Sequence, residues 1–117
     1  MTKNTKLNSN IKKILNDGKA EDIVSISLEG KSSIADYMII ATGTSSRHVS
    51  ALSNHIVTKL KKLGYKIFSI EGQRDGNWIL VDVGDIIIHL FRQEVRDFYN
   101  LDKMWSAPVD NIIEENI

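Results

Sequence analysis

The stretch Asn77–Phe91 reads NWILVDVGDIIIHLF and sets two aspartates and a histidine into an otherwise apolar run. Gly84-Asp85 can form a two-residue turn with glycine first, as a type II′ hairpin allows. In that hairpin Val83 pairs with Ile86. The stretch therefore predicts two antiparallel strands joined by a tight turn, and it raises the question of what the embedded polar residues do.

Alternation along the two strands separates their side chains into two faces. One face is wholly apolar and consists of Ile79, Val81, Val83, Ile86, Ile88 and Leu90. The other face is aromatic with embedded polar groups and consists of Trp78, Leu80, Asp82, Ile87, His89 and Phe91. Because Leu80 pairs with His89 in this register, Asp82 and His89 are diagonal neighbours. We expect the first face to be core.

The residues before the hairpin predict two helices and three strands. We expect helices over residues 6–20 and 45–63, and strands over residues 23–28, 37–41 and 66–70. The sequence GTSS at 43–46 supplies a hydroxyl N-cap for the second helix, and Gly64 suits its C-terminal end. The first strand should be half exposed and the second central. Strand 37–41, the second helix and strand 66–70 predict a right-handed crossover of parallel strands.

A further helical stripe over 92–105 precedes Pro108, which disfavours continuation. The element order α-β-β-α-β-β-β-α indicates an α/β (α+β) fold with a mixed five-stranded sheet covered by helices. We expect one domain over residues 1–117, with a core from about 6 to 107 and a loose tail over 108–117.

The composition is that of a globular protein, with 117 residues of which 42% are hydrophobic and 26% charged. No apolar run approaches the roughly 20 residues of a membrane helix. Cysteine is absent, and the first residues resemble neither a secretory signal nor a transit peptide, so we expect a cytoplasmic protein whose N-terminus is frayed as far as Asn4. Lys+Arg and Asp+Glu both number 15, so no overall positive field would draw the chain onto nucleic acid.

Asp82, Asp85 and His89 invite comparison with a metal site, since carboxylates and imidazole bind zinc and manganese. Asp82 and His89 could reach one ion, but no third strong ligand is visible. Acid/base catalysis lacks an identifiable nucleophile. We therefore favour a structural or interface role for these residues, and we expect no metal, no cofactor and no catalytic residue.

Ser45, Ser46 and Arg47 raise a separate hypothesis, because free N–H groups at a helix N-terminus and an arginine can hold an anion such as phosphate. This turn also looks like the glycine-serine turn of the nucleotidyltransferase fold. Those enzymes carry paired acidic residues on the following strand to hold metal ions. Here residues 66–70 offer no such pair and Glu71 stands alone.

The aromatic face of the hairpin needs a cover, because Trp78, Leu80 and Phe91 would be costly to leave in water. Either the final helix packs there through Phe98 and Trp105, or a protein partner does. The residue chemistry alone favours neither the final helix nor a protein partner as the cover.

Three segments carry a resemblance to a known family, and they run from about Lys19 to Trp105. They are KAEDIVSISLEGKSSIADYMIIATGTSSRHVSALSNHI, EGQRDGNWILVDVGDIIIHLF and RDFYNLDKMW. In their order and spacing they closely resemble the ribosomal silencing factor family, RsfS, also called Iojap-related. The N-terminal helix and the tail beyond Pro108 match weakly.

The resemblance implies a non-enzymatic protein of the nucleotidyltransferase-like fold. It implies binding to the large ribosomal subunit through ribosomal protein L-fourteen, steric block of subunit joining, lowered translation when nutrients are scarce, and a homodimer when free. The implied partner-binding residues are Trp78, Leu80, Asp82, His89 and Phe91, with Asp82 expected to meet a lysine or arginine. Neither membrane binding nor sequence-specific nucleic-acid binding is expected. The alternatives are a metal-dependent nucleotidyl or phosphoryl transfer enzyme and a small RNA-binding module.

Overall fold

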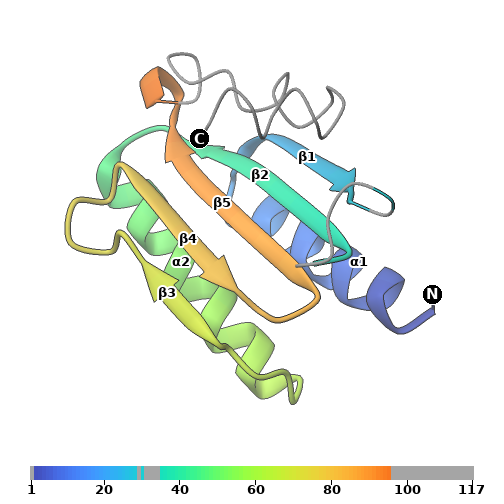
Figure 1. Cartoon of the computed structure of the whole chain (residues 1–117). Coiled ribbons are helices and arrows are strands. Elements are labelled where there is room, and N and C mark those ends of the chain that lie inside the picture. Colours follow the sequence, from blue (N-terminus) through green and yellow to red (C-terminus); the bar gives the residue numbers. More distant parts are fainter. Residues whose placement is uncertain (1, 29, 31–34, 96–117) are drawn as a thin grey trace.

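Two helices cover one face of a five-stranded mixed sheet in the computed structural model, which describes residues 2–28, 30 and 35–95 (Figure 1). The elements are α1 (Thr2–Asp17), β1 (Glu21–Ser27), β2 (Tyr37–Gly43), α2 (Ser46–Lys62), β3 (Ser69–Glu71), β4 (Trp78–Asp82) and β5 (Ile86–Arg92). The strands lie in the order β1-β2-β5-β4-β3. The predicted mixed five-stranded sheet is therefore confirmed.

The predicted hairpin is confirmed in its register. Leu80 pairs with His89, and the Val83 amide donates to the Ile86 carbonyl at 3.0 Å. Gly84 has φ +95°, which explains why glycine takes the first turn position. The turn is held to the rest of the sheet because the Asp85 carbonyl accepts the amides of Asp36 at 2.7 Å and Tyr37 at 3.2 Å.

The crossover joins strands that are parallel but not neighbours. β2 pairs with β5 in parallel, whereas β5, β4 and β3 follow one another in antiparallel pairs. β3 therefore runs in the same direction as β2 but lies at the far edge of the sheet. The predicted direction is confirmed, and β2 is central as predicted, between β1 and β5.

The bounds of α1, β1 and β3 differ most clearly from the predicted ones, while β2 extends two residues further and α2 is one residue shorter at each end. α1 begins at Thr2, before the predicted frayed end and the predicted start at Lys6, and it ends at Asp17. β1 begins at Glu21 and contains a bulge before Val24. β3 is shorter than predicted because its partner β4 ends at Asp82, opposite Ser69, so residues 66 and 67 have no strand beside them.

The larger core cluster lies between the sheet and both helices. It includes Leu7, Ile11, Ile14 and Leu15 of α1, Val49, Leu52, Ile56 and Leu60 of α2, and Ile39, Ala41, Ile79, Val81, Val83, Ile86, Ile88 and Leu90 beneath them. Burial of one such aliphatic side chain contributes about 1.5–3 kcal/mol. The apolar hairpin face is thus core, as predicted.

The predicted C-terminal helix can be followed only at its start. Residues 93–95 are helical, and the remainder, with Phe98, Trp105 and the tail over 108–117, lies outside the described residues. None of the helices in the described ranges has the length and apolarity needed to cross a membrane.

Candidate functional site

The second face of the β4–β5 hairpin holds the predicted partner-binding residues, which we call the Trp78 face: Trp78, Leu80, Asp82, His89 and Phe91. Cross-strand pairing sets Trp78 opposite Phe91 and Leu80 opposite His89. The Trp78 ring lies 5.6 Å from the Phe91 ring and 5.8 Å from the His89 ring, between centroids. The strands therefore bring all five residues together on the face away from the helices.

These side chains differ in their access to solvent. Phe91 is fully buried and His89 is 8% exposed, whereas Trp78, Leu80 and Asp82 are partly exposed. A second, smaller core cluster underlies them, with Met38, Ile40 and Phe91 among its buried members and Trp78 packed against it. A partner reaching this face would touch Trp78, Leu80 and Asp82, while Phe91 and His89 would support them from beneath.

A hydrogen bond between side chains fixes the orientation of the indole. Trp78 Nε1 donates to His89 Nδ1 at 3.0 Å, so the imidazole accepts at Nδ1 and, when neutral, carries its proton on Nε2. Burial lowers the pKa of His89 from 6.5 to about 4, which keeps the ring neutral at pH 7. The nitrogen that faces Trp78 is thereby committed to this bond and unavailable to a metal ion.

Asp82 has a local role that the sequence analysis missed. Its Oδ1 accepts the Gly84 amide at 2.8 Å, which closes an Asx turn at the start of the hairpin loop. The sequence feature that could have predicted this turn is an aspartate two residues before the turn glycine. In residues 2–28, 30 and 35–95, no three His, Asp or Glu side chains are grouped so that they could hold a metal ion. Asp85 lies exposed in the turn.

The residues of the hypothetical anion site form the start of α2. Ser45 is the N-cap, and its Oγ accepts the His48 amide at 3.1 Å, which confirms the predicted capping role. Ser46 Oγ donates to Asn77 Oδ1 at 3.2 Å, and Arg47 is exposed. Both hydroxyls are thus engaged within the chain, and anion binding by Ser45, Ser46 and Arg47 stays a prediction.

His48 has a structural role that sequence reasoning did not find. Its Nδ1 accepts the Thr44 amide at 2.9 Å, so its Nε2 donates to the Gly18 carbonyl at 2.9 Å. This side chain joins the end of α1 to the beginning of α2. No local pattern could have revealed the contact, because it spans thirty residues of chain.

Comparison with known proteins gives consistent results. The family described as "Ribosomal silencing factor during starvation" matches residues 2–116. The ribosomal silencing factor of Zymomonas mobilis is 53% identical over 92 residues, covering 79% of this chain and 69% of the relative. That of Haemophilus influenzae is 47% identical over 88 residues, covering 75% and 86%.

A solved structure and a eukaryotic relative extend the comparison. A crystal structure from Chromobacterium violaceum, 36% identical, superposes with a TM-score of 0.85 over 88% of this chain and 86% of that chain. A mouse protein named "Mitochondrial assembly of ribosomal large subunit protein 1" is 34% identical over 96 residues, covering 80% of this chain and 42% of its own length. The chain belongs to the ribosomal silencing factor family, RsfS.

Proposed function

We propose that the chain binds the large ribosomal subunit through ribosomal protein L-fourteen and uses the Trp78 face to do so. Bound there, it prevents joining of the subunits by steric block and lowers translation when nutrients are scarce. Membership of a family of ribosomal silencing factors supports the ribosome as the target. The name of the mouse relative supports the large subunit as the part that is bound.

The observation that carries this proposal is the orientation of Trp78. Its indole is held by His89 and packs at a tilt against the buried Phe91, yet part of its surface is exposed. A tryptophan whose rotamer is already fixed loses little conformational entropy when a partner covers it. Tryptophans of this kind are enriched among the residues that dominate protein interfaces.

Asp82 adds charge specificity to the same face. One carboxylate oxygen is engaged by the Gly84 amide, and within the described residues the other makes no hydrogen bond. We propose that a lysine or arginine of the ribosomal protein pairs with this second oxygen. A buried carboxylate without such a partner would cost several kcal/mol, so the pair would fix the register of the complex.

The first experiment mixes the purified protein with isolated large subunits, sediments them, and measures the bound fraction. The same protein is titrated with purified ribosomal protein L-fourteen, and subunit joining is followed by light scattering. We expect binding in both assays and loss of joining. Absence of binding in both assays would end the proposal.

Paired variants then test the surface. Trp78→Ala should lose binding to the subunit, whereas Tyr65→Ala, which removes a half-buried aromatic ring on the helix side, should bind as the parent does. Circular dichroism and the thermal midpoint show whether each variant is folded. Equal binding by the two folded variants would show that the Trp78 face is not the surface that contacts the subunit.

Asp82→Asn separates the charge of this residue from its turn role, since the amide oxygen can still accept the Gly84 N–H. We expect weaker binding without loss of stability. Glu21→Gln removes an exposed carboxylate from β1, outside both the Trp78 face and the helices, and serves as the matched control. If both variants weaken binding alike, the pairing assigned to Asp82 is wrong.

No nucleotide turnover is part of this function. We therefore expect no turnover by the parent, by Asp82→Asn or by His89→Ala in a nucleotide-hydrolysis or transfer assay with Mg²⁺ or Mn²⁺. Measured turnover that these variants abolish would favour the metal-dependent transfer enzyme instead.

We also propose that, without ribosomes, a second copy of the chain covers the Trp78 face. Two copies would then bury the partly exposed Trp78 and Leu80. Sedimentation equilibrium should give a dimer that Trp78→Ala converts to monomer, and a parent protein that is monomeric at tens of micromolar would contradict it.

A further inference from the structure

The basic residues of the chain are concentrated on the two helices, although the whole chain has no net charge. α1 and α2 each carry four lysine or arginine residues. Together they contain a single acidic residue, Asp17, at the end of α1. The basic residues are Lys3, Lys6, Lys12 and Lys13 on α1 and Arg47, Lys59, Lys61 and Lys62 on α2. All of these side chains from Lys6 onward are exposed. The helical layer is thus strongly positive, and the acidic residues other than Asp17 lie outside the two helices.

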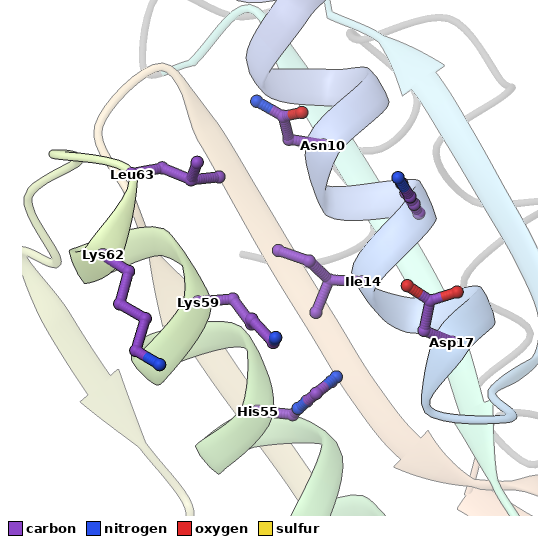
Figure 2. A pocket seen from close by; sticks show the side chains of 8 residues that line it. Asn10, Ile14, Asp17, His55, Lys59, Lys62 and Leu63 are labelled. Atoms are coloured by element: carbon purple, nitrogen blue, oxygen red, sulfur yellow. The ribbon is translucent and has the colours of Figure 1, made fainter.

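Between the two helices runs an open groove of about 390 Å³. Its lining residues are Asn10, Lys13, Ile14, Asp17, His55, Lys59, Lys62 and Leu63. Lys59 and His55 of α2 point toward α1, and Asn10 lies across from them (Figure 2). Three lysines from two helices therefore surround one concave surface.

Among the residues that the structure describes, the groove lysines make no ion pair or hydrogen bond with another side chain. An ion pair joins Arg92 to Glu94, far from the groove lysines in sequence. Lys59 and Lys62 lie in the last turn of α2, where the helix dipole favours positive charge. Lys13 lies on the other helix, just before the last turn of α1, so the dipole of α2 does not explain its presence.

We propose that the outer surface of α1 and α2, centred on this groove, binds the phosphate backbone of RNA without sequence preference. The Lys13, Lys59 and Lys62 ammonium groups contact phosphates, and the Asn10 amide and the His55 imidazole supply hydrogen bonds to phosphate or ribose. Zero net charge does not oppose this binding, because the field near the surface depends on local charge.

RNA suits the surface better than an acidic protein does. Stable protein interfaces have a core of aromatic or aliphatic anchors. In the groove Ile14 is only 7% exposed, which leaves Leu63 as its exposed large apolar side chain. Lysines spread along two helices instead match the repeated charge of a polyanion, which gains affinity through release of counterions.

This inference goes beyond the proposed ribosomal function and uses a different surface. The helices cover the opposite side of the sheet from the Trp78 face (Figure 1). A protein partner and an RNA strand could therefore be bound together. On a large subunit, the second contact would raise the total affinity by holding the chain at two places.

The test uses the purified full chain and a fluorescently labelled RNA duplex of about 16 base pairs, the span covered by one small RNA-binding domain. Anisotropy is measured at several salt concentrations. The groove variant is Lys13→Gln/Lys59→Gln/Lys62→Gln. The matched control, Lys19→Gln/Lys66→Gln/Arg74→Gln, removes the same charge from exposed positions outside both helices.

We expect the groove variant to bind roughly tenfold or more weakly at low salt, and its plot of log affinity against log salt to be shallower by about two to three. The control should stay within about twofold of the parent. Equal losses in the two variants, or a parent whose binding does not depend on salt, would overturn the proposal. Tighter binding to polyglutamate than to RNA would overturn it in favour of an acidic protein. No ribosome is present, so failure here is separate from failure at the Trp78 face.

Discussion

The two faces of the β4–β5 hairpin are built from alternate residues of the same strands, yet they differ in chemistry. The face beneath the helices contains only aliphatic side chains, and each is at most 6% exposed. The Trp78 face contains aromatic rings, an imidazole and a carboxylate, with part of its surface in contact with solvent. A sheet needs only the first kind of face to fold, so the polar groups of the second require another explanation.

Hydrogen bonding accounts for some of those groups. The Trp78 indole N–H donates a hydrogen bond to His89 Nδ1, and the Gly84 amide donates one to Asp82 Oδ1. These bonds offset desolvation and also fix side chains that remain within reach of a partner. The two faces therefore differ in role. The aliphatic face stabilises the fold by burial, whereas the hydrogen bonds of the Trp78 face also fix the orientation of side chains that a partner can reach.

The largest expected effect comes from the aliphatic face. Ile88→Ala removes a fully buried side chain beneath the helices and should lower the free energy of unfolding by about 2–5 kcal/mol. Leu80→Ala, on the partly exposed face, should cost less than about 1.5 kcal/mol because water already reaches the site. Urea denaturation measures both, and comparable losses would remove the distinction between the faces.

The next effect is a pH dependence that belongs to the Trp78 face. Unfolded histidine titrates near 6.5 and folded His89 has a pKa of about 4, so between these pH values the unfolded chain binds a proton that the folded chain does not. Stability should therefore fall as the pH drops through this window, by about 3 kcal/mol in total.

Denaturation curves of the parent, His89→Phe and His55→Gln between pH 7 and 4 measure this dependence. His89→Phe should lose the contribution from this window, whereas His55→Gln should keep it. An unchanged slope in His89→Phe would mean that other groups cause the acid sensitivity.

A smaller effect is expected from the indole N–H alone. Trp78→Phe keeps a ring beside Phe91 but leaves His89 Nδ1 without its donor, and should cost about 1–3 kcal/mol. Removing both partners in Trp78→Phe/His89→Leu should restore part of this loss, since no buried acceptor then remains. A double variant that is less stable than the sum of the single changes predicts would argue against this coupling.

The smallest expected effect lies away from both faces, at the N-cap of α2. Ser45→Ala should cost about 1 kcal/mol because the His48 amide loses its acceptor. Ser46→Ala, which affects an exposed bond to Asn77, is the control and should cost less. Thermal denaturation measures both losses. A larger loss for Ser46→Ala than for Ser45→Ala would mean that Ser45 is not the stabilising N-cap.

The hairpin could be predicted because its determinants are local. Alternation of Ile79, Val81 and Val83 fixes the faces, and Gly84 fixes the turn. The pairing of β2 with β5 could not be predicted, since it joins segments more than forty residues apart and depends on which strands reach each other after collapse. The length of β3 likewise depends on where its partner ends.

Which residues share the Trp78 face could be predicted from strand alternation, but their geometry could not. Strand register placed Trp78 and His89 on one face, but only the fold reveals the bond between them and the burial that keeps the imidazole neutral. His48 was missed because its partner, Gly18, lies in a different element. The net charge of the chain did not reveal how its charges are distributed, because it averages the basic helices with the acidic residues elsewhere.

The most direct test of the central claim is the affinity of Leu80→Asp for purified large ribosomal subunits, measured by sedimentation over a range of subunit concentrations. Leu80 is partly exposed on the Trp78 face and takes no part in the Trp78–His89 bond, so the variant should keep the near-ultraviolet circular dichroism of the parent. We expect binding to weaken by roughly thirtyfold or more, because a charge would be buried against the partner. Binding equal to that of the parent, with the fold intact, would contradict the assignment of this face to the ribosome.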